Sequence, residues 1–159
     1  MQQVNFFALP GFFFWTTPMK LRLGVTDIPY DYGDAAATTH EVAALLEEKY
    51  QLFTHFYQLH EREILSELSQ VIAEQVDNSI RFGAPMADSL ELSGASQLFS
   101  DFLNLREMEG LGVEGVPTGA AVKGVNSRKK GKKGIPGRPS FIDGGLLLAS
   151  LRVWVDFNG

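Results

Sequence analysis

Half of the chain's cations gather in one segment, residues 123–138, which reads KGVNSRKKGKKGIPGR. This segment holds seven of the fourteen Lys and Arg residues and no acidic residue, and the other side chains together carry a formal charge of −12. Cations at this density bind phosphates or acidic protein surfaces. The candidate contacts with DNA or with a neighbouring subunit are therefore Lys123, Arg128, Lys129, Lys130, Lys132, Lys133 and Arg138.

The same segment has few means of folding alone. Glycines recur along it, and its apolar residues are Val125 and Ile135. A glycine-rich backbone loses much entropy on ordering, and two apolar side chains bury too little surface to offset that loss. We expect residues 119–139 to form a mobile basic loop that becomes ordered on a polyanion or on an acidic neighbouring subunit.

A nucleotide-binding loop is excluded by the order of residues in this segment. The phosphate-loop pattern places Ser or Thr after Gly-Lys, at the start of a helix. Here Gly131 and Lys132 are followed by Lys133, and Pro136 prevents a helix. The remaining property of this segment is its positive charge, which favours a role in assembly or nucleic-acid contact over one in catalysis.

Other patterns for catalysis or metal binding are also missing from the sequence. His40, His55 and His60 are fifteen and five positions apart, spacings that do not place two rings on one helical face. The chain has no cysteine, which excludes disulfides and thiolate ligands. A serine-nucleophile motif is absent as well. We predict a protein that is not an enzyme, with no catalytic residue, no metal and no cofactor.

The elements that position the basic segment begin with one very long helix. Thr38 and Glu41 form a capping-box pattern, and apolar residues then recur at helical spacing without Pro or Gly over residues 39–82. Gly83 is placed to end the helix. Unbroken, it would be roughly 65 Å long. Such a helix either bends, near His60–Glu63, or protrudes and packs along a neighbour.

Shorter elements follow the long helix. Residues 84–93 read as a connection, and Ser93 is placed to cap a second helix that ends at Gly110. Asp143 is placed to cap a short helix, and residues 151–157 alternate between apolar and polar side chains, which predicts a closing strand. The predicted fold is α+β: one very long helix plus a second helix packed with a small, mainly antiparallel sheet, and a long basic loop.

The amino-terminal 25 residues read as an extended apolar arm of this single domain, which spans residues 1–159. The run VNFFALPGFFFW lacks the preceding basic residues of a secretory signal and is too short to span a bilayer. It forms either a strand pair in the protein's own core or an arm on another subunit. The candidate subunit-interface side chains are Phe12, Phe13, Phe14 and Trp15, with Trp154 from the closing strand.

The carboxy-terminal region resembles the signature of neck or tail-completion proteins of tailed bacteriophages. The resemblance covers about the last forty residues. It rests on GRPSFIDGGL, residues 137–146, and on ASLRVWV, residues 149–155. In that family a basic Gly-rich loop precedes a Pro-Phe-Ile-Asp-Thr-Gly-like turn, a short helix and a closing strand. Here Gly144 stands in place of the Thr.

The resemblance implies a ring-forming α+β subunit at the head–tail junction, around the channel through which genomic DNA passes. The implied partners are copies of itself, adjacent portal, connector and tail proteins, and genomic DNA, with no membrane. The implied location is the virion, assembled in the host cytoplasm. In such a ring the closing strand, residues 151–157, is expected to pair at a subunit boundary.

The alternative is a nucleic-acid-binding module that uses residues 123–138 on free DNA or RNA. Two observations weigh against it. No aromatic residue lies within that segment, whereas single-strand platforms interleave aromatic and basic side chains. The chain as a whole carries a formal charge of −5.

Overall fold

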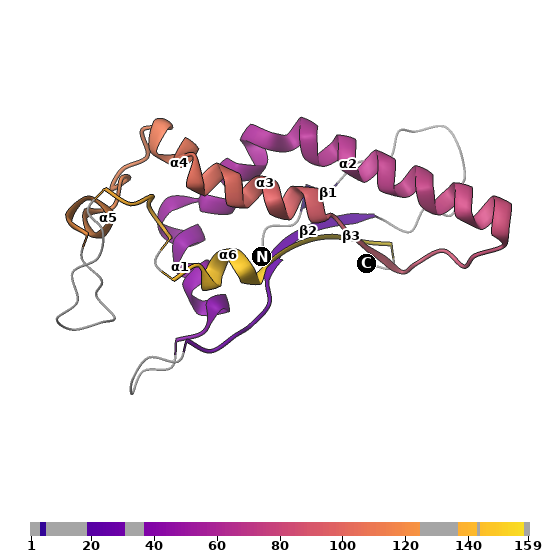
Figure 1. Ribbon diagram of the computed structural model, residues 1–159, viewed down its shortest axis with the longest axis horizontal. Coiled ribbons are helices and arrows are strands. Elements are labelled where there is room, and N and C mark those ends of the chain that lie inside the picture. The colour runs from indigo at the N-terminus through magenta and orange to yellow at the C-terminus, as the bar shows by residue number, and fades with distance from the viewer. Residues whose placement is uncertain (1–3, 6–18, 31–36, 125–136, 143, 158–159) are drawn as a thin grey trace.

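The computed structural model describes residues 4–5, 19–30, 37–124, 137–142 and 144–157, and its mixture of helices and antiparallel strands confirms the predicted α+β fold (Figure 1). The strands are β1 (Val4–Asn5), β2 (Lys20–Val25), β3 (Ser89–Glu91) and β4 (Leu151–Asp156). The helices are α1 (Thr39–Tyr50), α2 (Leu52–Phe82), α3 (Ser93–Asn104), α4 (Glu107–Gly110), α5 (Gly119–Lys123) and α6 (Leu146–Ser150).

The sheet is antiparallel, in the order β1-β2-β4-β3. Val155 of the predicted closing strand pairs with Leu21 on one side and with Leu90 on the other. The expectation that this strand pairs at a subunit boundary is therefore wrong, because strands of the same chain flank it. The expected extended arm partly belongs to this sheet too, since β1 and β2 are two of its strands.

The core lies between one face of the sheet and the helices α2 and α3, which pack side by side over it (Figure 1). The alternating pattern of β4 is confirmed, because Val153 and Val155 are fully buried while Arg152 is exposed. Phe99 of α3 stacks on the ring of Phe53 with centroids 5.4 Å apart. These contacts fix the direction in which α2 leaves the sheet.

The long helix is interrupted twice. Its capping box is confirmed, with Thr38 and Glu41 each accepting a hydrogen bond from the other's backbone N–H. The bend expected near His60 is confirmed, since that residue has φ −113° and ψ 19°. A second break lies at Gln51, where a left-handed backbone (φ 50°) separates α1 from α2. Glu47 compensates for the missing side-chain cap of α2 by accepting the backbone N–H of Phe53 at 2.8 Å.

Beyond Leu68, α2 contains no buried residue. This last part, residues 69–82, is called the α2 tip, and it is about 21 Å long. The predicted stop is confirmed, because Gly83 adopts φ 64° and donates its N–H to the carbonyl of Ser79 at 3.0 Å. Of the two alternatives for the long helix, the bend is the one that the structure shows, and packing along a neighbour stays a prediction.

The second helix differs from its prediction at both ends. Ser93 is its first residue and not its cap; the carboxylate of Glu67, in α2, accepts the N–H groups of Gly94 at 2.7 Å and Ala95 at 2.6 Å. The helix stops at Asn104 and does not reach Gly110. Arg106 has a left-handed backbone (φ 61°), which separates α3 from the short helix α4. The connection before it contains the strand β3, which was not expected.

Candidate functional site

Two of the seven candidate basic residues, Lys123 and Arg138, lie among the described residues. Outside the described residues lie Arg128, Lys129, Lys130, Lys132, Lys133, Phe12, Phe13, Phe14, Trp15 and Asp143. The loop was expected to begin at residue 119, but its first five residues are helical. Residues 119–123 form α5, because the Thr118 hydroxyl caps it by accepting the N–H of Ala121 at 3.2 Å.

The two ends of the basic segment meet at one carbonyl group. The oxygen of Ala121 accepts the N–H of Gly124 at 3.4 Å and the N–H of Gly137 at 3.0 Å. Both glycines have a positive φ, 62° and 72°, which other residues rarely adopt. The described residues on the two sides of positions 125–136, Gly124 and Gly137, are thus held together at a single point.

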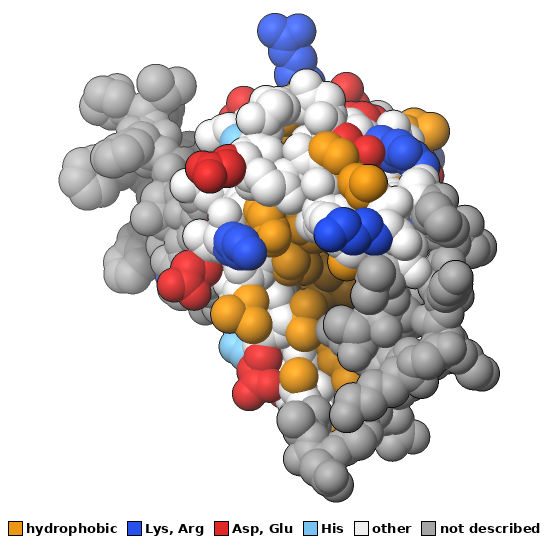
Figure 2. All heavy atoms as spheres, turned by 90° about the vertical axis from the view of Figure 1, so that its left-hand side faces the viewer, with side chains coloured by type: hydrophobic (Ala, Val, Ile, Leu, Met, Phe, Trp, Pro, Cys, Tyr) orange, Lys and Arg blue, Asp and Glu red, His pale blue; other side chains and the backbone are white. Residues whose placement is uncertain are grey.

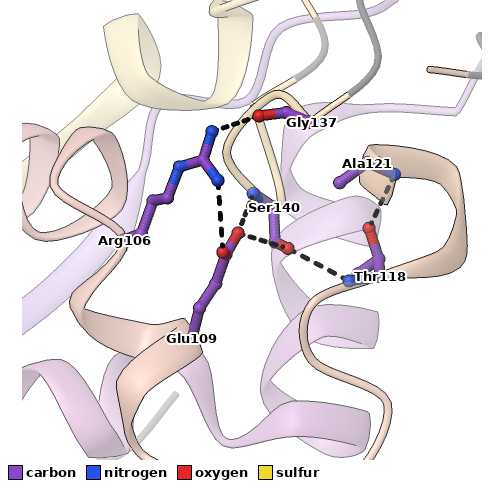
Figure 3. A network of polar contacts seen from close by, with 6 residues as sticks. All are labelled: Arg106, Glu109, Thr118, Ala121, Gly137 and Ser140. Carbon is purple, nitrogen blue, oxygen red and sulfur yellow. Dashed lines mark hydrogen bonds and ion pairs between the residues drawn. The ribbon is translucent and has the colours of Figure 1, made fainter. Parts of the chain in front are cut away.

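A polar network fixes this point to the helices (Figure 3). The Glu109 carboxylate accepts both the N–H and the hydroxyl of Ser140, each at 2.9 Å. The same hydroxyl accepts the N–H of Thr118 at 3.0 Å. Arg106 donates to the carbonyl of Gly137 and forms an ion pair with Glu109 at 3.8 Å. We call this network the loop base; its residues are Arg106, Glu109, Thr118, Ala121, Gly137 and Ser140.

Lys123 and Arg138 differ in their exposure and in their contacts within the chain. Arg138 is partly buried and donates from Nη1 to the carbonyl of Ile142, so it holds the turn after the basic segment. Lys123 is exposed in the last turn of α5. Of this pair, Lys123 is therefore the candidate for contact with another molecule.

Hydrophobic side chains are exposed at the same end of the molecule. Figure 2 looks onto this end and shows them gathered in a hollow, with charged side chains around it. Leu45 of α1 is 63% exposed, and Leu111 and Val122, on either side of the turn that leads into α5, are 41% and 54% exposed. This end is hence suited to protein contact as well as to charge.

A second hollow, the lateral groove, lies where α1 and the first turns of α2 meet β2, with a volume of about 340 Å³. Trp154, a predicted interface residue, lines it and packs on Gly24, where an added Cβ would stand 3.1 Å from the indole ring. Its other lining residues are Leu23, Val25, His40, Ala43, Ala44, Glu47, Phe53, Thr54, Tyr57 and Gln58. Apart from Trp154, nothing in the sequence pattern pointed to this groove, which joins four separate elements.

Tyr57 and Glu47, two of the ionisable residues that line the lateral groove, form hydrogen bonds within the protein. Burial raises the pKa of Tyr57 to about 12, and the hydrogen bond to Glu61 and the charge of that residue add to the shift. The phenol therefore stays protonated at neutral pH and donates to Glu61 at 3.0 Å. Glu47 is held by the start of α2. The groove is consequently an apolar surface with little free charge.

The described part of the chain contains no cluster of three or more His, Asp or Glu side chains placed to hold a metal ion. No helix within it is both long and apolar enough to cross a membrane. Comparisons with protein-family models, with curated proteins and with solved structures find no match for this chain.

Replacing Glu109 by alanine is expected to lower the free energy of unfolding by about 2–3 kcal/mol, because the N–H and hydroxyl of the buried Ser140 lose their acceptor. Chemical denaturation measures the change. Glu114→Ala, at an exposed position on the following loop, is the matched control and should change stability by less than about 0.5 kcal/mol. Equal effects of the two substitutions would show that the loop base contributes nothing to stability.

Proposed function

We propose that this chain is a structural, non-enzymatic virion protein that forms a homo-oligomeric ring at the head–tail junction of a tailed bacteriophage. The observation that carries the proposal is the α2 tip, which has no fully buried residue: Val71 and Ile72 at its start still pack against the core, and the apolar side chains near its end are exposed. A subunit that displays such a helix has contact surface to offer a neighbour.

The α2 tip is not a polar, solvated helix. Ile80 is 79% exposed and Phe82 is 77% exposed, and Val76, one turn before Ile80, is 42% exposed. Fully burying one such side chain contributes about 1.5–3 kcal/mol. Val76 and Ile80 are four positions apart and share one face of α2, and Phe82 lies on another side of the last turn. Exposed apolar residues mark protein-interaction sites in soluble proteins, so burial of this end of α2 against another subunit would stabilise an assembly.

The loop base supports the same proposal from the other end of the molecule. Residues 137–142, which carry part of the resemblance to phage neck proteins, contribute Gly137 and Ser140 to the loop base. The basic segment is thereby presented from a fixed point. Its cations complement either the DNA in a channel or the acidic remainder of an adjacent subunit, whose formal charge is −12.

The proposed partners are further copies of the chain, the adjoining portal, connector and tail proteins, and genomic DNA in the channel. The proposed location is the virion. The chemistry required is binding alone, and in line with this Glu109 in the loop base and Glu47 in the lateral groove accept backbone N–H groups of the protein itself.

Measurement of the mass of the purified chain in solution, together with electron-microscope images of the same sample, tests the proposal. We expect a closed ring with a single copy number. A chain that stays monomeric at every accessible concentration, both alone and with phage connector and tail proteins, would overturn the proposal.

Simultaneous replacement of Lys129, Lys130, Lys132 and Lys133 by alanine separates the proposal from a free nucleic-acid-binding module. We expect the variant to fold and form rings like the intact chain, and to be impaired in particle assembly or DNA passage. A nucleic-acid-binding module would instead be a monomer that retains DNA through these side chains. The log–log slope of its affinity against salt concentration would then become shallower by about 0.9 for each phosphate that the variant no longer neutralises.

A further inference from the structure

We infer that the subunits join head to tail, with the end of α2 of one copy inserted into the lateral groove of the next copy. This inference rests on the proposed function, because it names the two surfaces that meet in the ring. A ring requires two different and complementary patches on each subunit, since identical patches close into a dimer. The α2 tip and the lateral groove are such a pair.

The two surfaces lie far apart within one subunit. The end of α2 lies at one extreme of the long axis of the molecule, and α1, which lines the lateral groove, lies toward the other (Figure 1). The end of α2 therefore does not fill its own groove. A contact between one subunit's protrusion and the next subunit's hollow repeats along a chain of copies and closes when the rotation per subunit permits.

The apolar content of the two surfaces matches. Aliphatic and aromatic side chains of β2, α2 and β4, namely Leu23, Val25, Phe53, Tyr57 and Trp154, line the groove. The last turn of α2 carries Ile80 and Phe82, and its one cation, Arg81, is paired with Asp77 at 2.7 Å. Arg81 thus enters the contact as an ion pair. The carboxylate that lines the groove, Glu47, keeps its charge and is hydrogen-bonded by the N–H groups of Phe53 and Thr54, which lowers the cost of burying it.

The size of the groove specifies how the helix enters. A volume of about 340 Å³ is at the lower limit of ligand pockets and admits a few side chains but not the flank of a helix. Ile80 and Phe82 are two positions apart and so point to different sides of α2. A contact along the flank would bury one of them, whereas an end-on approach brings both to the groove.

The groove holds donor side chains for the polar groups at the end of α2, apart from the Glu47 carboxylate, which already accepts N–H groups of its own chain. The last carbonyl groups of a helix lack intrahelical donors and form its negative pole. At the end of α2, Gly83 donates to Ser79, which leaves the carbonyls of the last turn as acceptors. The groove offers two exposed donor side chains, the imidazole of His40 and the amide of Gln58.

A mixing experiment tests this inference. The first variant, Ile80→Asp with Phe82→Asp, charges the helix end, and the second, Ala44→Arg, places a cation in the groove. These residues are exposed, so all three substitutions leave the core unchanged. The matched controls are Asn78→Asp, on the same turn of α2, and Ala44→Ser, which keeps the groove open. Mass measurement in solution provides the readout, with the fluorescence of Trp154 in a Trp15→Phe background reporting on the groove.

Each variant alone is expected to be monomeric, with the subunit dissociation constant raised at least about 100-fold, as for the loss of central interface residues. The two controls should form rings. An equimolar mixture of the two variants should give dimers only, because one intact end of α2 and one intact groove remain between them. Trp154 emission should shift when these dimers form.

Three results would overturn the inference. If rings form from the charged-helix variant, the end of α2 is not the contact, while the proposed ring itself stands. If the mixture contains no dimers, the helix ends meet each other or another surface. If the intact chain forms no ring under any condition, the proposed function fails together with this inference.

Discussion

Replacement of Phe99 by alanine should lower the free energy of unfolding by about 3–5 kcal/mol, the range measured when a large aromatic core residue is truncated. Phe99 is fully buried in α3, with its ring 5.0 Å from that of Phe56 in an edge-to-face arrangement and stacked on that of Phe53. The loss would remove a third or more of the stability of a typical domain. Thermal or denaturant unfolding monitored by circular dichroism measures it.

Leu105→Ala is the matched control for Phe99→Ala. Leu105 directly follows α3 and is 72% exposed, so its truncation should change stability by less than about 0.5 kcal/mol. If the two variants have the same free energy of unfolding, the aromatic cluster does not form the core. Because this cluster holds α2 against α3, Phe99→Ala should also weaken the proposed ring under conditions where the variant is still folded.

Glu67→Ala should lower the free energy of unfolding by about 2–4 kcal/mol. The Glu67 carboxylate accepts two backbone N–H groups at the start of α3, and hydrogen bonds to a charged group contribute about 1.5–3 kcal/mol each. The negative charge also favours the positive end of the helix. Denaturant unfolding measures the loss, and Glu67→Gln, which keeps an acceptor oxygen, should retain part of the stability.

Glu63→Ala provides the control for Glu67→Ala. Glu63 lies one turn earlier on α2 and is exposed, and its replacement removes the same charge and nearly the same side-chain atoms. We expect a change below about 0.5 kcal/mol. A loss in Glu63→Ala as large as that in Glu67→Ala would mean that general charge on α2, and not the cap on α3, stabilises the protein.

The features predicted correctly from the sequence are those in which cause and effect lie a few residues apart. The capping box of Thr38 and Glu41 involves positions three apart, and Gly83 ends α2 through its own backbone. The alternation in β4 is likewise a local pattern. Such signals are complete within one turn or one strand, so a single sequence suffices to read them.

The features that sequence reasoning missed depend on partners distant in the chain. The start of α3 is capped by Glu67, 28 positions before Ala95, and no local pattern indicates this. Gln51 adopts a left-handed conformation without being glycine, because Glu47 and the flanking helices hold it there. The strand β3 has three residues and exists because β4 offers it an edge.

The part of the candidate site that depends on local composition was predictable, and the part that depends on distant contacts was not. Charge density identified residues 123–138 directly from composition, whereas the loop base joins Glu109 to Ser140 across 31 positions. The lateral groove joins four elements, of which the sequence indicated Trp154 alone. Interaction surfaces assembled from several elements become visible only when the fold is known.

The shared acceptor at Ala121 has an evolutionary consequence. Because Gly124 and Gly137 both bond to that one oxygen, the body of the protein imposes no particular length on the residues between them. Doubling a closed loop costs only about 0.6 kcal/mol in chain entropy. Insertions, deletions and changes of charge between these two glycines can therefore accumulate almost neutrally for folding. Under the proposed function, that tolerance would let related viruses adapt residues 125–136 to different genomes while the scaffold is inherited unchanged.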